Sequence, residues 1–373
     1  MPGRAPEQAR RAGAASPRCP FLNKYNITGS VMQSGSRTFV CDPRAGDGVY
    51  NDPAVCYNMV TGSGEWPEIM KWGGSMRVLN FGSLNLDYVY QVDHFVQPGE
   101  TLSAASRVVK FGGKGLNQSI ALARAGADVA HAGCIGAGGE ALKARLEQDG
   151  VDTSMLLKVD EMQGHTVIQV DPHGENCILL YGGSNQCVTG AQIRETLAGY
   201  TAGDWLVLQN EINGLAEIVD TASAGGMVIA LNPSPYDKRL EAVDLSKLSW
   251  LLVNEVEAGQ IAGSDDPEAA WTWLHARYPR LSVLITLGGA GSVAYRVNGD
   301  AVETARQDAF RVKALDTTAA GDTYTGYFIS ALMAGLPLKE CMRRASMASA
   351  ISVTRLGAAD SIPGLDEVEQ SLK

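Results

Sequence analysis

The segment Asp316–Asp322 (DTTAAGD) sets a carboxylate and three small residues directly before a helix-like run at residues 323–335. The small residues at 319–321 let backbone amides approach an anion closely, and a helix N-terminus adds about half a positive charge there. A carboxylate beside such a phosphate pocket suits a general base, so we predict that Asp322 takes the proton of a hydroxyl that attacks a phosphoryl group. The alternative is that Asp322 only stabilises the start of a helix.

A second glycine-rich segment, Phe111–Asn117 (FGGKGLN), also opens a helix-like run, at residues 118–125, which stops at Gly126. It lacks the Gly-Lys-Ser/Thr of a nucleotide-binding P-loop, and its glycine spacing differs from that of a dinucleotide fingerprint. Both of those site types are therefore excluded for this loop.

Short apolar runs alternate with helix-length segments beyond residue 76. This alternation predicts an α/β fold, a doubly wound and mostly parallel sheet with helices on both faces. The apolar runs are 78–81, 128–132, 205–209, 227–231, 250–253 and 282–286, and helix-length segments include 140–149 and 267–278. Two further pairs of alternating segments, 88–92 with 105–110 and 165–170 with 176–181, predict antiparallel ribbons outside that sheet.

Polar or small residues follow several of the predicted strands, where ligands bind in such sheets. Asn85 and Asp87 follow the first strand, and Glu211, Asn254 and Gly288 follow three later ones. Ordinary structure explains some of them equally well: a turn for Asn85 and Asp87, and the first turn of a helix for Asn254.

The two glycine-rich segments together resemble the two signatures of the ribokinase-like (PfkB) sugar kinases. Gly126 and Gly136 stand at the expected distances beyond the first of them. Six more segments follow in the family's order: Asn80–Asp87 (NFGSLNLD), Pro98–Thr101 (PGET), Leu231–Pro235 (LNPSP), Asn254–Glu257 (NEVE), Leu284–Gly289 (LITLGG) and Val353–Ala358 (VTRLGA). The resemblance runs from about residue 77 to the C-terminus.

This resemblance implies a ribokinase-like α/β fold for residues 76–373, with a small antiparallel sheet as a lid over the sugar. The lid strands are expected around 88–111 and 163–182, and in the family this lid also makes the contact of a homodimer. An exposed sheet edge needs covering, so a dimer is physically reasonable.

The resemblance also assigns roles residue by residue. Asp322 matches the catalytic base, and the amides of Ala319, Ala320 and Gly321 match an anion hole. The sugar-contacting positions match Asn85, Asp87, Gly112, Gly113, Lys114, Asn117, Glu211 and Asp322. The ATP-binding positions match Asn254, Thr286, Gly288, Gly289, Gly291, Ala320 and Gly321.

Two cations are implied in the same way. Glu257 matches a position that helps to hold Mg²⁺ through water, as that ion prefers. The positions around a monovalent-cation site, expected to hold K⁺, match Asp316, Thr318, Ser352, Arg355, Gly357 and Ser361. Only Asp316 supplies a full negative charge there, so we expect the others to act partly through carbonyl oxygens.

The expected activity is ATP-dependent phosphorylation of D-ribose at its 5-hydroxyl. A fructokinase, deoxyribokinase or nucleoside kinase is the alternative within the family, because lid and pocket shape decide the acceptor. A catalytically silent sugar-binding protein is a further alternative. The chain departs from the usual family pattern at Ala319, where many members carry Gly, and at Tyr327, where a larger side chain either narrows a pocket or repacks the core.

Composition limits the possible partners. The net charge is −10 and the pI about 5.1, which disfavours nucleic acid and anionic membrane surfaces as ligands. No apolar stretch approaches the ~18 residues of a bilayer span. Seven cysteines without a Cys-x-x-Cys pair predict reduced thiols and a cytoplasmic location.

Residues 1–75 differ from the rest, with scattered Pro, Gly, Ser and Arg and no helical or strand period. We expect a disordered or non-native extension, with Met76 as a candidate true start. The Arg- and Ala-rich first 20 residues leave a targeting segment as one alternative, and a small accessory element is another.

Overall fold

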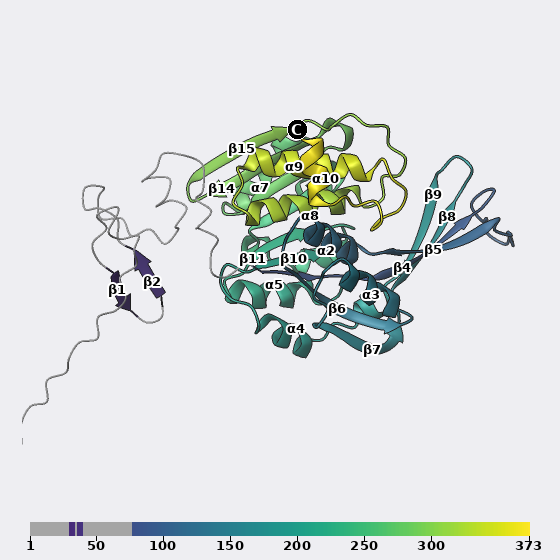
Figure 1. The fold of residues 1–373 in the computed structure, drawn as a ribbon, viewed down its shortest axis with the longest axis horizontal. Helices are drawn as coiled ribbons and strands as arrows, with labels where there is room; N and C mark the ends of the chain where they lie inside the picture. The colour runs from purple at the N-terminus through teal and green to yellow at the C-terminus, as the bar shows by residue number, and fades with distance from the viewer. Residues whose placement is uncertain (1–29, 34–35, 40–76) are drawn as a thin grey trace, which may run out of the picture. The chain divides into compact units, whose positions relative to one another are not determined.

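The computed structural model describes residues 30–33, 36–39 and 77–373 (Figure 1). The chain divides into two units, 1–73 and 74–373, which are described separately. In the first unit, strands β1 (Ser30–Gln33) and β2 (Ser36–Phe39) pair antiparallel. The sequence analysis expected no strand here, because neither segment, SVMQ or SRTF, is an apolar run. The predictions of a disordered extension, a targeting segment and a start at Met76 otherwise lie outside the described residues.

The second unit is built on a nine-stranded sheet with the order β15-β14-β13-β12-β11-β10-β3-β6-β7. The strands from β13 to β7 pair in parallel, and β14 and β15 extend one edge antiparallel. Their bounds are β3 Val78–Phe81, β6 Val129–Ala137, β7 Leu156–Met162, β10 Trp205–Gln209, β11 Val228–Asn232, β12 Trp250–Asn254, β13 Ser282–Thr286, β14 Ser292–Asn298 and β15 Ala301–Gln307.

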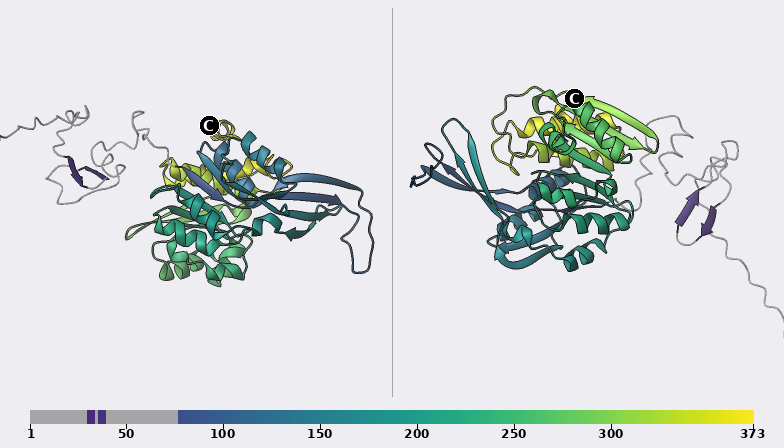
Figure 2. Two further views of the ribbon diagram at one scale, coloured as in Figure 1. Left: turned by 90° about the horizontal axis from the view of Figure 1, so that it is seen from below. Right: turned by 180° about the vertical axis from the view of Figure 1, so that it is seen from behind.

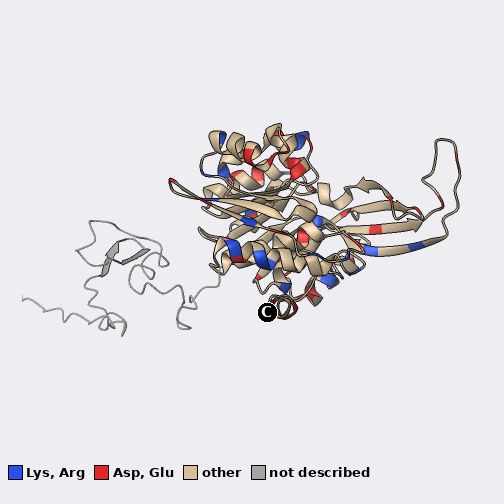
Figure 3. Cartoon of the chain, turned by 90° about the horizontal axis from the view of Figure 1, so that it is seen from above, with Lys and Arg blue, Asp and Glu red and all other residues tan. Residues whose placement is uncertain are grey.

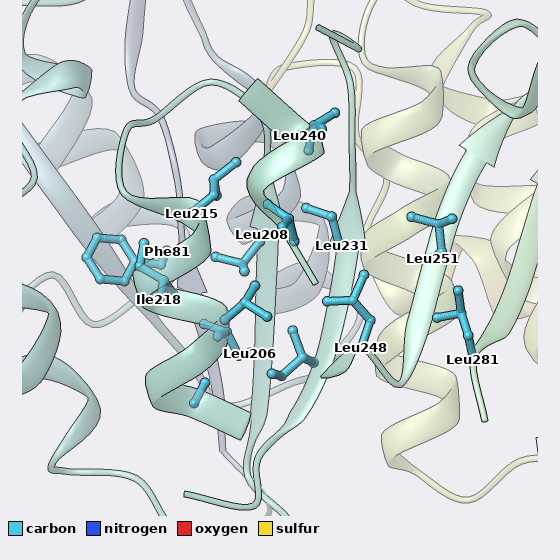
Figure 4. Close-up of a cluster of buried hydrophobic side chains, with 14 of the residues drawn as sticks. Phe81, Leu206, Leu208, Leu215, Ile218, Leu231, Leu240, Leu248, Leu251 and Leu281 are labelled. Carbon is cyan, nitrogen blue, oxygen red and sulfur yellow. The ribbon is translucent and has the colours of Figure 1, made fainter. Parts of the chain in front are cut away.

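Helices cover both faces of this sheet, because successive residues of a strand point to opposite sides and both sides are apolar. In β10, Leu206 belongs to one buried cluster and Val207 to the other. The first cluster packs under α4 (Gly190–Leu197), α5 (Leu215–Ala224), α6 (Glu255–Ala262) and α7 (Pro267–Arg277), and part of it is drawn in Figure 4. The second packs under α2 (Lys114–Arg124), α3 (Glu140–Gln148), α8 (Ala320–Met333), α9 (Leu338–Ser352) and α10 (Leu365–Ser371).

A separate four-stranded sheet, the small sheet, has the order β5-β4-β8-β9 and extends away from the α/β body in both views of Figure 2. Its strands are β4 Asn85–Gln91, β5 Ser106–Gly112, β8 His165–Val170 and β9 Asn176–Tyr181. The two predicted antiparallel ribbons, β4 with β5 and β8 with β9, are confirmed, and a parallel pairing of β4 with β8 joins them.

The predicted doubly wound sheet is confirmed, and its predicted strands shift by at most a few residues. The edge strands β7 and β15, and β14 beside β15, were not predicted. None of the seven residues of β7 is buried, and the same holds for β15, so neither strand stands out as an apolar run. Short 3₁₀ turns complete the fold: η3 Gly183–Gln186, η4 Lys238–Ala242, η5 Leu245–Lys247 and η6 Gly288–Ala290.

Charged residues of the described part of the chain are mixed in sign over the helices, as Figure 3 shows. None of the helices in that part combines the length and the apolar character that a membrane crossing needs.

Candidate active site

A cavity of about 240 Å³ lies where α2, α6 and α8 begin, at the carboxyl ends of β11, β12 and β13. The parallel strands end at one edge of the sheet, so residues that are far apart in the sequence meet there. Its lining is mostly polar: Lys114, Asn232, Ser234, Leu252, Val253, Asn254, Glu257, Leu284, Thr286, Thr317, Ala319, Ala320, Gly321, Asp322 and Thr325.

Asp322 occupies the third position of α8 and is only 6% exposed. Asn117 Nδ2 donates to its Oδ2 (3.0 Å), and Gln118 Nε2 donates to its Oδ1 (2.9 Å). Its position just inside a helix N-terminus is as predicted. The carboxylate therefore stands beside the positive end of α8 and on the wall of the cavity.

The turn before α8 is formed by Ala319, whose φ of +61° lies in the left-handed region. In this conformation Ala319 turns the chain into the first turn of α8. Among the described residues, the amides of Ala319, Gly321 and Asp322 have no hydrogen-bond acceptor, as the free donors of a helix N-terminus should. The Ala320 amide was also predicted to belong to the anion hole. It is not free in this structure, because it already donates to the carbonyl oxygen of Thr317 (3.2 Å).

Lys114 supplies the positive charge of the cavity. Burial acts to lower the pKa of its ammonium group, but the carboxylates of Asp322, Glu211 and Glu257 outweigh that effect and hold the pKa above its ordinary value. Glu211 in turn accepts from the backbone amide of Lys114 (3.0 Å) and from the hydroxyl of Ser83. Burial raises the pKa of Glu211 against the lowering effect of Lys114 and Ser83.

Asp87 lies in β4, opposite Lys110 of β5. Thr166 Oγ1 donates to its Oδ1 (2.6 Å), and its Oδ2 lies over Gly112, where an added Cβ would come within 1.9 Å. The pKa of Asp87 is raised to about 6. Burial is the largest cause and the Glu211 carboxylate adds to it, whereas the hydrogen bond from Thr166 and the charge of Lys110 act to lower the pKa. Gly112 is therefore required because any side chain there would collide with the carboxylate.

Asn85 is also at the predicted place, at the start of β4, and is 3% exposed. Its Oδ1 accepts from Asn185 Nδ2 (2.7 Å), so part of its hydrogen-bonding capacity is used within the protein. Asn185 also makes two hydrogen bonds with the backbone of Leu84: its Oδ1 accepts from the Leu84 amide, and its Nδ2 donates to the Leu84 carbonyl oxygen. Gly113, at the N-cap of α2 with φ of +91°, is where the chain turns into that helix.

Asn117 has a buried oxygen without a partner. Its Nδ2 donates to Asp322, but its Oδ1 finds no hydrogen-bond donor among the described residues. A buried polar atom of this kind costs free energy unless a ligand or water supplies the missing bond. It fits a sugar hydroxyl, which can donate one.

On the ATP side, Asn254 and Glu257 form a capping box at the start of α6, with Asn254 Oδ1 accepting from the Glu257 amide (2.8 Å) and Glu257 Oε2 from the Asn254 amide (3.2 Å). The helix-start interpretation is thus correct for this pair. Both residues nevertheless line the cavity. Oxygen atoms of Glu257, Asn232 and Asn254 on one wall are the donor type that Mg²⁺ takes, so the residues fit that ion.

Thr286 lines the cavity at the end of β13, whereas the glycines that follow it do not. An added Cβ on Gly289 would meet no atom within 4 Å, which leaves its backbone open to a ligand. Gly288, with φ of +52°, begins η6 beside it. Gly291 has a structural reason instead, because a Cβ would come within 2.0 Å of the Gln307 carbonyl oxygen in the neighbouring strand.

The predicted K⁺ ligands gather around the loop that precedes α8. Asp316 Oδ1 accepts from the Thr318 amide (2.9 Å) and Oδ2 from the Gly357 amide (2.9 Å). Burial alone would raise the pKa of Asp316, but these partners outweigh it and the pKa lies below its ordinary value. The bond to Oδ2 thus links the loop at 357 to the loop at 316, whereas the bond to Oδ1 lies within the loop at 316.

The other three predicted K⁺ residues do not direct their side chains into this loop. The hydroxyls of Ser352 and Ser361 donate to the carbonyl oxygens of Ser349 and Ala358, and Arg355 pairs with Glu367. Any contribution of these residues must therefore come from backbone carbonyl oxygens. Carbonyl oxygens suit a hard cation such as K⁺, so the site still fits the ion.

Tyr327 repacks the core and does not narrow the cavity. It is 1% exposed, and its hydroxyl donates to the carbonyl oxygen of Pro363 (2.8 Å). It is not among the residues that line the cavity.

Sequence analysis missed several residues of the site: Ser83, Gln118, Thr166, Asn185, Asn232 and Thr325. Gln118 adjoins the glycine-rich loop and Asn232 ends β11, so proximity to those motifs could have indicated both. Thr166 and Asn185 lie in ordinary strand and turn sequence, and only the pairing of β4 with β8 brings Thr166 to Asp87.

Comparison with known proteins agrees with this arrangement. Residues 76–365 match the model of the pfkB family carbohydrate kinases. The ribokinase of Haemophilus influenzae is 36% identical over 302 residues, which cover 78% of this chain and 97% of that protein. The ribokinase of Schizosaccharomyces pombe is 34% identical, and the match covers 79% of this chain and 98% of that protein.

Solved structures give the same result. The ribokinase of Cryptococcus neoformans in complex with ADP has a TM-score of 0.70 at 34% identity and covers 80% of this chain and 100% of that one. The ribokinase of Arabidopsis thaliana complexed with ribose and ATP has a TM-score of 0.71 at 25% identity, with 80% and 99% covered. The chain therefore belongs to the pfkB family of carbohydrate kinases and is an ATP-dependent sugar kinase.

Proposed function

We propose that this chain is a ribokinase, which transfers the terminal phosphoryl group of ATP to the 5-hydroxyl of D-ribose. The observation that carries the proposal is the position of Asp322, a buried carboxylate at the N-terminus of α8 that shares a cavity wall with Lys114. The choice of ribose is supported by the relatives of 34–36% identity, which are ribokinases.

In this mechanism Asp322 accepts the proton of the attacking hydroxyl, because it is the carboxylate closest to the first-turn amides of α8. The amides of Ala319 and Gly321 stabilise the negative charge on the transferring phosphoryl group, and Ala320 keeps the turn open because its side chain is small. Lys114 adds a full positive charge on the same side.

The sugar lies between the small sheet and α2. Asp87 and Glu211 accept from its hydroxyls, and Asn117 Oδ1 gains the donor that it lacks in the protein alone. The remaining contacts are assigned to Asn85 and Lys114, with Gly112 and Gly113 allowing close approach.

ATP lies along Asn254, Thr286 and the glycines at 288 and 289. Glu257 would hold Mg²⁺ through water, and the bound ion would neutralise charge on the phosphates. K⁺ would be held near Asp316, and the carbonyl oxygens at 318, 352, 355, 357 and 361 would supply further ligands. Since Ser349 Oγ donates to the Ala320 carbonyl oxygen (3.1 Å), α9 is connected to the first turn of α8 and can pass on the effect of K⁺.

The small sheet acts as a lid and as the contact of a homodimer. Its edge strand β9 is exposed along all six residues and carries Ile178, Leu179, Leu180 and Tyr181. An open, apolar edge strand invites pairing with another chain unless it is covered. A cytoplasmic location is proposed from the cysteines, of which the four described are free.

The test is ADP release by the purified protein with MgATP and KCl, using ribose, deoxyribose, fructose and adenosine as separate acceptors. The proposal predicts the highest kcat/KM with ribose. Turnover only with another acceptor would keep the kinase mechanism and replace the substrate, and sugar binding without any turnover would indicate a silent sugar-binding protein.

A further inference from the structure

Two consecutive residues of α2 hold both oxygens of the Asp322 carboxylate. Asn117 donates to Oδ2 and Gln118 to Oδ1. Gln118 is completely buried, and both ends of its amide bond to protein groups, Nε2 to Asp322 and Oε1 to Gln209. Contact with a substrate therefore does not account for Gln118, whereas its bond to Asp322 does.

Only one orientation of the Gln118 amide suits its surroundings. Its Oε1 accepts from Gln209 Nε2 (2.7 Å), and the same Gln209 nitrogen donates to Asn80 Oδ1 (2.9 Å). Reversing either glutamine amide would set oxygen against oxygen in a fully buried region, at a high cost. Gln209 therefore decides that Gln118 presents its NH₂ group to Asp322.

The bonds continue into the sheet. Asn80 Nδ2 donates to the Gly115 carbonyl oxygen (2.7 Å) and to Ser119 Oγ (2.8 Å), and Ser119 Oγ lies 2.8 Å from His131 Nδ1. Burial lowers the pKa of His131 to about 4, so its ring is neutral at physiological pH. Strands β3, β6 and β10 supply Asn80, His131 and Gln209, so the network is anchored in the rigid sheet.

We propose that Gln118 is a positioning residue for the catalytic base, and that Gln209 and Asn80 fix the orientation in which it acts. The bond from Gln118 stabilises the ionised carboxylate and fixes the plane in which it meets the substrate hydroxyl. This inference rests on the proposed role of Asp322 as the base.

The charged groups around the Asp322 carboxylate are Lys114 at the start of α2, Glu211 after β10 and Glu257 in α6. All three residues are unchanged in the variants Gln118→Leu, Gln118→Glu and Gln192→Leu. A change in pH dependence then reports the loss of the Gln118 bond and not a change in these charges.

The experiment compares kcat, KM and the pH profile of kcat for the full chain and Gln118→Leu, with ribose and MgATP. A displaced base costs roughly 10²-fold in rate, so kcat should fall by about that factor while KM for both substrates changes little. The acidic limb of the profile should move to higher pH, because the ionised base has lost a donor. A purely structural role would lower the amount of folded protein without moving that limb.

Gln192→Leu is the matched control. Gln192 is a buried glutamine of α4 that donates to the Gly133 carbonyl oxygen (2.7 Å) and has no contact with Asp322. Its loss should leave kcat and the pH profile of the remaining folded enzyme unchanged. A Gln118→Leu variant that behaves like Gln192→Leu would overturn the inference.

Gln118→Glu keeps the shape of the side chain and serves if Gln118→Leu fails to fold. Two adjacent carboxylates share a proton, so the acidic limb should move further to higher pH than in Gln118→Leu. A wild-type profile in Gln118→Glu would likewise overturn the inference. Asp322→Asn separates the two claims: if it stays active the proposed base is wrong, and if it is inactive while Gln118→Leu is unaffected only the inference fails.

Discussion

Gly326 of α8 packs so closely on Ala121 of α2 that a Cβ added to the glycine would lie 2.4 Å from the Cβ of Ala121. The backbone of Leu122 would be 2.8 Å away, so neither helix can yield by moving a side chain alone. This close approach brings the first turns of the two helices together, where Asn117 and Gln118 meet Asp322.

Gly326→Ala should therefore impair both stability and catalysis. Overpacking of this kind lowers the free energy of unfolding by about 1–3 kcal/mol, and the separated helices lengthen the bonds to Asp322. Urea unfolding and kcat with ribose measure the two effects. Gly364→Ala is the control, because a Cβ there would meet no atom within 4 Å. Equal kcat in Gly326→Ala and the wild type would show that helix spacing does not determine the position of the base.

Asp87→Asn should stabilise the protein at alkaline pH while weakening sugar binding. The folded-state pKa of Asp87 is about 6 against an ordinary value of 3.8, so the stability associated with its protonated form is lost as pH rises through about 6. At pH 8 the variant should gain about 1–3 kcal/mol in free energy of unfolding, and the gain should shrink at pH 5.

Urea unfolding of Asp87→Asn at pH 8 and pH 5 gives this difference, with the exposed Asp160→Asn as control. A gain that is the same at both pH values would contradict the burial of a titrating carboxylate at residue 87. The KM for ribose should rise in Asp87→Asn and stay unchanged in Asp160→Asn.

Lys114→Met should reduce kcat by roughly 10²–10³-fold, the usual loss when one stabilising donor of a developing anion is removed. It also removes the cation that offsets Asp322, Glu211 and Glu257, so the protein should be less stable at pH 8 than at pH 5, relative to the wild type. Lys143→Met, on the exposed side of α3, is the matched control. Near wild-type kcat in Lys114→Met would remove this lysine from the mechanism.

K⁺ should raise kcat in comparison with Na⁺ or choline at equal ionic strength. The loops at 316 and 357 are joined through Asp316, and α9 contacts the first turn of α8 through Ser349. Asp316→Asn removes the only full negative charge among the predicted ligands of the cation, so it should weaken the response to KCl. An identical response to all three chlorides would mean that this loop holds no activating cation.

Much of the fold was predictable because the central strands are buried on both faces and appear as uninterrupted apolar runs, as in Trp205–Gln209. The edge strand Ala301–Gln307 was not, because none of its residues is buried and four of the seven are polar. Asp322 was recognisable from its glycine-rich neighbours. The partners that orient it were not, since Gln209 is 91 residues from Gln118 and only the sheet brings them together.

The measurement that tests the central claim most directly is kcat for Asp322→Asn with ribose and MgATP, alongside ribose binding by calorimetry. Asparagine keeps the size of the side chain and its contact with Asn117, so we expect binding to persist while kcat falls by about 10²–10⁴-fold, the range for a lost general base. Retention of wild-type kcat with a normal KM would contradict the account, because the proton of the attacking hydroxyl would then leave by another route.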